Sequence, residues 1–207
     1  MPKKNEDLHV NAPDKSVIAL LLIDVINDFD FEDGNQLLEH ALPMAWKLAS
    51  FKKKAKDAKV PVIYVNDNFG KWQSDFKRLL KHCQSETAKG CKIANLLQPN
   101  ADDYFVLKPK HSGFYSTTLD LLLEYLRVKT LILTGITTDI CILFTANDAY
   151  MRDFNLFVPQ DCVASVRRDE NQHALEYIER VLKADTRPSD EIDFRKLAKE
   201  RRKKQNR

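Results

Sequence analysis

Short apolar runs alternate with longer segments of helical periodicity along this chain. Five runs have the length and composition of strands buried on both faces, and they lie near 17–23, 60–65, 104–107, 129–134 and 155–159. Apolar residues recur at helical spacing between and after them, near 36–58, 73–82, 117–127, 140–152 and 170–183. This alternation predicts an α/β fold, a doubly wound sheet of five or six parallel strands flanked by helices, with right-handed crossovers. A short sixth strand is expected near 184–186.

The length of 207 residues fits one such domain with a sizeable core. We place this domain at 17–190, after a polar segment at 1–16 and before a basic tail at 191–207. Between residues 66 and 103 the periodic pattern weakens, which indicates an excursion from the regular alternation. No segment of 18 apolar residues occurs, and residues 1–16 lack the apolar stretch of a leader peptide, so we expect a cytoplasmic protein with no membrane partner.

The net charge of +3 is unevenly distributed. Residues 195–207 carry eight basic side chains against Glu200, a net +7, which leaves −4 for the rest of the chain. Such a tail can bind nucleic acid, but no aromatic residues are interleaved with its charges, so we favour a solvated, frayed terminus and expect no nucleic-acid partner. Four cysteines, at 83, 91, 141 and 162, suit a reducing compartment without structural disulfides.

One of these cysteines lies where an apolar run gives way to a helix. Gly135 ends the run, and Cys141 follows at the expected start of the helix, which Asp139 or Thr138 can cap. The macrodipole at a helix N-terminus stabilises a thiolate, so we expect a lowered pKa for Cys141. A buried cysteine that packs as a small apolar side chain is the alternative.

Two other apolar runs end in a charged residue. The run at 18–23 ends at Asp24, and the run at 104–107 ends at Lys108, just before Pro109. Parallel strands meet with their carboxyl ends at one edge of the sheet, where open α/β sheets bind their ligands. An acid, a lysine and a cysteine delivered to that edge would make a nucleophilic site, with a base, an electrostatic stabiliser and a nucleophile.

Three motifs in this order resemble those of the isochorismatase-like cysteine hydrolases, a superfamily that contains nicotinamidases, N-carbamoylsarcosine amidohydrolases and isochorismatases. The motifs are the strand ending at Asp24 with Asn27-Asp28-Phe29, then Lys108 with Ser112 and Phe114, then 135–141 followed by Thr145-Ala146 and Asp148-Ala149. The resemblance covers residues 17 to about 185. It implies a Rossmann-like fold and the activity of a cysteine hydrolase.

The resemblance also implies roles for individual residues. Cys141 would be the nucleophile, Asp24 would take and return its proton, and Lys108 would stabilise the charges between them. A cis peptide bond between Ile136 and Thr137 would aim the amides of Thr137 and Cys141 into an oxyanion hole. The implied reaction is hydrolysis of a small amide or related C–N substrate through an acyl-enzyme.

Departures from the family pattern narrow this interpretation. Many members carry Gln two positions after the first aspartate, where this chain has Ile26. Nicotinamidases bind a metal through an aspartate and histidines just after the second strand, but residues 65–72 contain no histidine. That stretch offers only the oxygen donors of Asn66, Asp67 and Asn68, which are a poor ligand set for zinc. We therefore expect neither a metal nor another cofactor.

Two alternative functions stay open. A thiol-reactive or non-catalytic member of the fold would keep Cys141 but would need neither Asp24 nor Lys108. An isochorismatase-type vinyl ether hydrolase works by acid catalysis and typically lacks the cysteine, so Cys141 favours attack on a carbonyl or nitrile carbon.

Aromatic and apolar side chains in the loops raise two further expectations. Four aromatic residues are expected at the carboxyl edge: Phe29, Phe69, Trp72 and Phe114. They either line a pocket for the small-molecule substrate or pack against the rest of the domain and hold their loops in place. The resemblance implies a homo-oligomer, a dimer or larger. The 66–103 excursion is the expected interface, because it also carries Phe76, Leu79 and Leu80.

Overall fold

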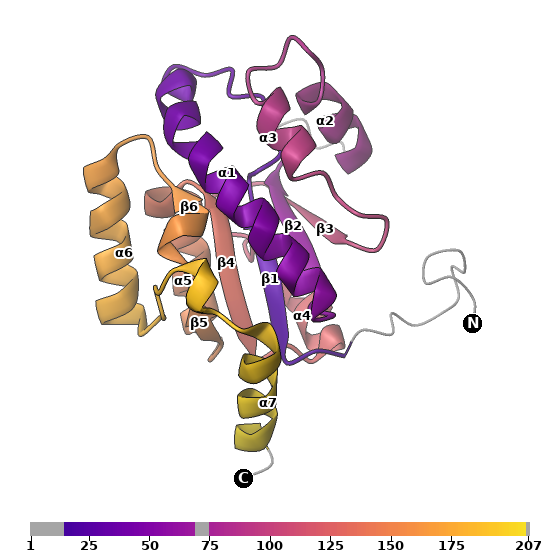
Figure 1. The fold of residues 1–207 in the computed structure, drawn as a ribbon, viewed down its shortest axis with the longest axis vertical. Coiled ribbons are helices and arrows are strands. Elements are labelled where there is room, and N and C mark those ends of the chain that lie inside the picture. The colour runs from indigo at the N-terminus through magenta and orange to yellow at the C-terminus, as the bar shows by residue number, and fades with distance from the viewer. Residues whose placement is uncertain (1–14, 69–74, 206–207) are drawn as a thin grey trace.

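A parallel sheet forms the centre of the computed structural model, which describes residues 15–68 and 75–205. Its strands are β1 (Ile18–Ile23), β2 (Val62–Asp67), β3 (Tyr104–Lys108), β4 (Thr130–Ile136), β5 (Asn155–Phe157) and β6 (Val163–Ala164). The strand order is β3-β2-β1-β4-β5, with β6 paired to the end of β4, and every pair is parallel (Figure 1). The predicted fold class is confirmed. The strands after β1 are added on one side of it and those from β4 onward on the other side. Ligands bind in such folds at this switch point between β1 and β4.

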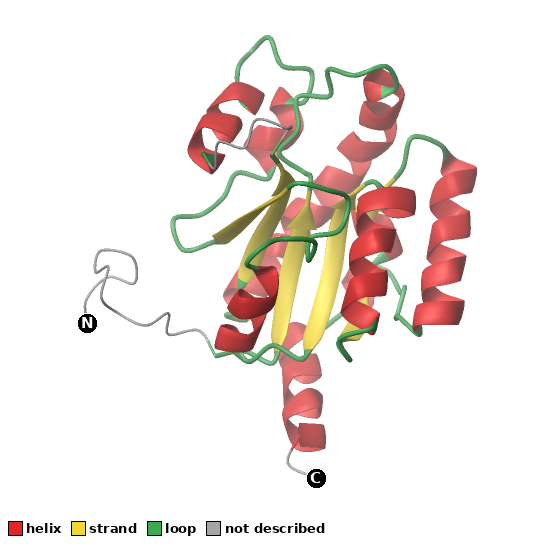
Figure 2. Ribbon diagram, turned by 180° about the vertical axis from the view of Figure 1, so that it is seen from behind, coloured by secondary structure: helices red, strands yellow, loops and turns green. Residues whose placement is uncertain are grey.

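Helices cover both faces of the sheet. One face holds α1 (Gly34–Asp57), α2 (Phe76–Cys83), α3 (Cys91–Leu96) and α7 (Phe194–Gln205). The other holds α4 (Leu119–Leu126), α5 (Leu143–Tyr150) and α6 (Arg168–Leu182), which Figure 2 shows from behind. All six residues of β1 are fully buried, and alternate ones face opposite layers. This explains why the strand reads as a continuous apolar run.

Three short helices lie at the ends of these elements. The π-helical turn η1 (Thr138–Ile142) leads into α5, and two 3-10 turns, η2 (Gln160–Cys162) and η3 (Ser189–Glu191), flank α6 in the chain. Among the described residues, no helix combines the length and the apolar character needed to cross a bilayer.

The regular strands and the longer helices lie close to their predicted positions, but three elements were not predicted. The sixth strand is β6, and residues 184–186 contribute a single bridge, from Asp185 to Phe157. A strand of two residues carries no period, and β6 pairs with Gly135 and Ile136 of β4, beyond the stretch of β4 that pairs with β5. The six-residue α3 is too short for a helical pattern, and α7 was expected to be a frayed tail.

The expectation of a frayed C-terminus is wrong for the start of α7. Phe194 and Leu197 are 3% and 8% exposed, and the Phe194 ring lies 4.7 Å from that of Phe51 on α1. These two apolar side chains are one turn apart and anchor the start of the helix in the layer of α1, and Figure 1 shows α7 extending from the bottom of the domain. The basic residues around them obscured this short signal.

Phe76 was expected to contribute to a subunit interface in the 66–103 excursion, but its side chain is already buried within the single chain. This side chain is 5% exposed in the single chain, and its ring lies 5.0 Å from that of Phe105 and 5.9 Å from that of Tyr64. Leu79 and Leu80 pack against the same core. The apolar side chains of α2 therefore cover the outer edge of the sheet, while Phe69 and Trp72 lie outside the described residues.

Candidate active site

Three strands bring Asp24, Lys108 and Cys141 together at the carboxyl edge of the sheet. Asp24 directly follows β1, Lys108 is the last residue of β3, and Cys141 lies in η1 after β4. Lys108 Nζ is 2.8 Å from Asp24 Oδ2 and 3.5 Å from Cys141 Sγ. The carboxyl group of Asp24 is also close enough to the thiol of Cys141 to shift its pKa. The three residues that the sequence singled out therefore form one contacting group.

The backbone at the end of β1 turns sharply to present Asp24. Its φ of 52° lies in the left-handed region, which aspartate tolerates better than most residues and which often occurs at functional sites. Its amide donates to the carbonyl of Val65, and its Oδ1 accepts from the amide of Asp67 over 2.7 Å. The neighbouring strand β2 thus holds both the backbone and the carboxylate of Asp24. This contribution of Asp67 was not predicted from the sequence.

Lys108 is fully buried, and its ammonium has several oxygen and sulfur partners. Besides Asp24 and Cys141, Nζ donates to the carbonyl of Lys110 over 3.2 Å and lies 3.8 Å from Asp67 Oδ2. Burial alone lowers the pKa of Lys108, but its interactions with Asp24, Cys141 and Asp67 outweigh that effect, and the pKa is raised. The lysine is therefore a permanent cation at neutral pH.

The acid of this group is a stronger base than a surface aspartate. Burial raises the pKa of Asp24 above its ordinary value, and the charge of Lys108 offsets only part of that effect. A buried ion pair of this kind contributes little net stability, yet removing one partner costs about 3–5 kcal/mol. The pair is thus suited to hold a proton acceptor beside the thiol rather than to stabilise the fold.

The thiol does not have the lowered pKa that its sequence position suggested. Burial, and then the carboxylate of Asp24, raise the pKa of Cys141 to about 12, while Lys108 acts in the opposite direction. The expectation based on the helix macrodipole is wrong because η1 is a short π-helical turn that precedes α5, and because a carboxylate lies beside the sulfur. Cys141 therefore rests as a thiol beside the carboxyl group of Asp24.

The first turn around Cys141 is held from outside rather than by a capping side chain. Neither predicted cap forms, because Thr138 donates its hydroxyl to Asn171 Oδ1 on α6 and Asp139 accepts from the hydroxyl of Ser165. The amides of Ile140 and Ile142 both donate to the carbonyl of Thr137, over 3.3 and 3.0 Å.

The segment before this turn has the special backbone that the resemblance implied. The peptide bond between Ile136 and Thr137 is cis. Gly135 has a φ of 115°, and a Cβ atom there would lie 2.0 Å from the carbonyl oxygen of Ile23. Glycine is required at this position because β4 pairs with β1 at Gly135 and leaves the sheet immediately afterwards.

The described residues at the end of β2 do not converge on a metal position. Asn66 is buried and donates from Nδ2 to the carbonyl of Ile26 over 2.9 Å, whereas Asp67 follows on the other side of the strand and faces Lys108. Within the described part of the chain, no group of three or more His, Cys, Asp or Glu side chains could hold a metal ion.

Two of the predicted pocket residues belong to the core instead. Phe29 has no exposed surface and packs in the layer of α1, and Phe114 is 5% exposed beneath the guanidinium of Arg152 at 4.7 Å. The prediction that they line a pocket is wrong, because both rings anchor their loops to the domain. Phe69 and Trp72 lie outside the described residues.

Comparisons with known proteins agree with this geometry. The isochorismatase domain family matches residues 18–186. YaaI of Bacillus subtilis, an isochorismatase family protein, is 42% identical over 174 residues, which cover 84% of this chain and 95% of YaaI. Enterobactin synthase component B of Escherichia coli is 31% identical over 136 residues, which cover 63% of this chain but 47% of that protein.

Two solved structures share both the fold and part of the sequence. N-carbamoylsarcosine amidase of Thermoplasma acidophilum has a TM-score of 0.66 and 30% identity, with 85% of this chain and 98% of that chain covered. The pyrazinamidase/nicotinamidase of Streptococcus mutans has a TM-score of 0.65 and 30% identity, with 82% and 99% covered. With its contacting aspartate, lysine and cysteine at the carboxyl edge of the sheet, this chain belongs to the isochorismatase family and is a hydrolase of that family.

Proposed function

We propose that this protein hydrolyses a small amide or related C–N substrate through a thioester on Cys141. The observation that carries this proposal is the buried ammonium of Lys108, which lies 2.8 Å from the carboxylate of Asp24 and 3.5 Å from the sulfur. A base, a cation and a nucleophile in mutual contact are the parts that covalent acyl transfer requires. The similarity to an N-carbamoylsarcosine amidase and a nicotinamidase supports the choice of a C–N bond.

The first half of the reaction begins from the neutral thiol. The carboxylate of Asp24 takes the proton of Cys141 as the sulfur attacks the carbonyl carbon, and the C–S bond forms while the carbonyl electrons move to oxygen. Lys108 stabilises the sulfur while it carries negative charge. The tetrahedral intermediate then collapses, the C–N bond breaks, and the leaving nitrogen receives the proton from Asp24, which leaves a thioester on Cys141.

The amides of Thr137 and Cys141 are proposed to receive the oxyanion. The neighbouring amides of Ile140 and Ile142 both donate to the carbonyl of Thr137, and the Cys141 amide does not share in these two bonds. One donor of this kind is typically worth about 2.7–4 kcal/mol to the transition state. In the second half, Asp24 takes a proton from water, hydroxide attacks the thioester, and the thiolate that leaves recovers the proton, which gives a carboxylic acid and the free enzyme.

A substrate screen with matched variants tests this proposal. Small amides, carbamoyl compounds and nitriles are offered to the wild type, Cys141→Ala, Cys141→Ser and Asp24→Asn, and product is followed by mass spectrometry. We expect turnover of at least one C–N substrate by the wild type, loss of most of it in each variant, and an acyl adduct on Cys141 after acid quenching. Penalties in double variants should not add, because the residues act as a unit. Near-full turnover by Cys141→Ser, or cleavage of vinyl ethers alone, would refute the proposal.

We further propose that the protein is a homo-oligomer of the cytoplasm. The family resemblance implies the assembly, and all four cysteines are free thiols, which a reducing compartment keeps in that state. Sedimentation velocity at micromolar concentration should report a dimer or a larger species. A monomer with full activity would contradict both the assembly and any contribution of a second subunit to the site.

A further inference from the structure

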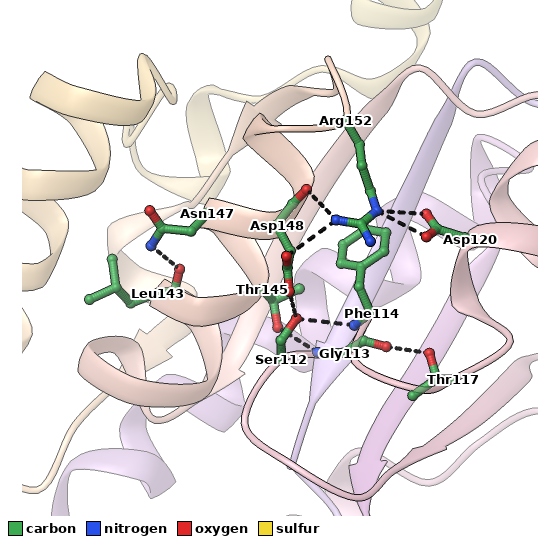
Figure 3. Close-up of polar contacts among 10 residues, drawn as sticks. All are labelled: Ser112, Gly113, Phe114, Thr117, Asp120, Leu143, Thr145, Asn147, Asp148 and Arg152. Carbon is green, nitrogen blue, oxygen red and sulfur yellow. Dashed lines mark hydrogen bonds and ion pairs between the residues drawn. The ribbon is translucent and has the colours of Figure 1, made fainter.

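The segment that follows Lys108 is bound to the helix that follows Cys141, and Figure 3 shows the contacts. Ser112 donates its hydroxyl to Asp148 Oδ2 on α5, and the amide of Gly113 donates to the hydroxyl of Thr145 over 3.0 Å. The first segment follows Lys108 in the chain, and the second follows Cys141. Their relative position therefore affects the distance between the two reacting groups.

Thr145 is the residue of this set that reaches the nucleophile. Its hydroxyl donates to the carbonyl of Cys141 over 2.7 Å while it accepts from the amide of Gly113. A threonine hydroxyl that bonds the carbonyl four residues earlier is common in helices, but the second bond joins this one to the lysine segment. The side chain has no exposed surface, so solvent does not compete for either bond.

The position of Lys108 depends on the same segment. Its ammonium has three protons, and it donates to Asp24 Oδ2, to the carbonyl of Lys110 over 3.2 Å and to Cys141 Sγ over 3.5 Å. The contact with sulfur is the longest of the three. A displacement of the segment after Lys108 moves the Lys110 carbonyl and changes how the ammonium divides its protons, with the sulfur contact the first to be lost.

Contacts nearer the surface support the same junction. Asp148, which accepts from Ser112, also accepts from Arg152 over 3.2 Å, and Arg152 donates to Asp120 over 2.9 Å above the ring of Phe114 (Figure 3). The Arg152 side chain is about a third exposed, so its ion pairs are individually weak. The buried hydroxyl of Thr145 is therefore the more rigid of the two links.

We propose that Thr145 is a positioning residue that holds the ammonium of Lys108 against the sulfur of Cys141. Its effect on turnover rests on the function proposed above, but its effect on the thiol does not. The charged groups around that thiol are Asp24, which follows β1, and Lys108 from β3, with Asp67 from β2 beside the lysine. When the ammonium moves away, the sulfur faces the carboxylate without a compensating cation and is deprotonated less readily.

A trio of variants isolates this role. Thr145→Val removes both hydrogen bonds with little change of shape, whereas Thr145→Ser retains the hydroxyl. Thr134→Val is the matched control, because Thr134 is also fully buried and its hydroxyl also donates to a backbone carbonyl, that of Leu21, over 2.7 Å. Thr134 lies in β4 and has no role in joining the lysine segment to α5.

The readout is the rate at which iodoacetamide alkylates Cys141, followed by peptide mass mapping between pH 7.5 and about 9.5, where the rate follows the thiolate fraction. We expect Thr145→Val to slow alkylation roughly tenfold at each pH, which displaces the pH–rate curve by about one pH unit. This is the effect expected when the thiolate loses a stabilisation about equal to that of one hydrogen bond. Thr145→Ser and Thr134→Val should keep the wild-type rate. With an amide substrate, kcat should fall in Thr145→Val with KM changed less than about twofold.

Each result decides the matter. Alkylation of Thr145→Val that is slowed no more than that of Thr134→Val, or a Thr145→Ser variant that does not restore the rate, overturns the inference. If the alkylation rates shift but no C–N substrate is turned over by the wild type, the proposed function fails and the positioning role stands. Should Thr145→Val not fold, Thr145→Ala removes the same two hydrogen bonds, and an unchanged alkylation rate there overturns the inference equally.

Discussion

Replacing Lys108 by methionine should destabilise the protein as well as inactivate it. Methionine keeps an unbranched side chain but leaves the carboxylate of Asp24, a residue 6% exposed, without the cation now 2.8 Å away. Removing one partner of a buried pair costs about 3–5 kcal/mol. For a chain of this length each kcal/mol lowers Tm by about 2–4 °C, so we expect a loss of roughly 6–20 °C.

A second substitution separates charge from packing. Asp24→Asn keeps the shape of the side chain and tolerates the left-handed backbone at this position, but it leaves the buried cation of Lys108 without its nearest carboxylate. Asp24→Asn combined with Lys108→Met contains no buried charge and should recover most of the lost stability. The coupling free energy from urea denaturation of the four proteins at pH 7 should be about 3 kcal/mol or more. Activity should stay absent in the double variant, since the base and the cation are both gone.

The pH dependence of the single variant provides a second measurement. Burial already raises the pKa of Asp24 above its ordinary value of 3.8, and the loss of Lys108 removes the largest opposing effect, so the pKa rises further. A carboxyl group with a raised folded-state pKa contributes stability that is fully present below about pH 3.8 and is lost as the pH rises through the folded-state value. The deficit of Lys108→Met should therefore grow from acid to neutral pH. A deficit below about 1 kcal/mol at pH 7, or additive effects in the double variant, would refute this reasoning.

Three further outcomes are expected. Gly135→Ala should lower the free energy of unfolding by at least about 1–3 kcal/mol in thermal or urea melts, because its φ is 115° and the new Cβ would meet the backbone oxygen of Ile23 at 2.0 Å; a melting curve like that of the wild type would contradict this. Iodoacetamide should modify Cys141 before Cys83 and Cys162, because those two have no exposed surface; mass mapping with the reverse order would be inconsistent with an accessible site. Exhaustive chelation should leave turnover unchanged, whereas stoichiometric zinc whose removal abolishes activity would show a metal requirement.

The sequence by itself determined the architecture and singled out the three residues that meet at the carboxyl edge of the sheet. A parallel strand covered by helices on both faces is apolar at nearly every position, so the run that forms β1 could be recognised from the sequence without knowledge of its neighbours. Each such run ends where the chain reaches the carboxyl edge of the sheet. A charged residue at that point, as at Asp24 and Lys108, therefore indicated the site directly.

Only the tertiary structure decided how these groups are tuned and what surrounds them. The pKa of Cys141 depends on burial and on a carboxylate delivered by another strand, and these outweigh the local effect of a helix start. Whether Phe29 and Phe114 line a pocket or anchor a loop depends on which neighbours cover them. The bonds of Thr145 to Gly113 and Cys141 likewise join two segments whose proximity no local pattern encodes. Burial, charge proximity and hydrogen-bond partners are properties of the assembled chain, because they arise between residues that are far apart in the sequence.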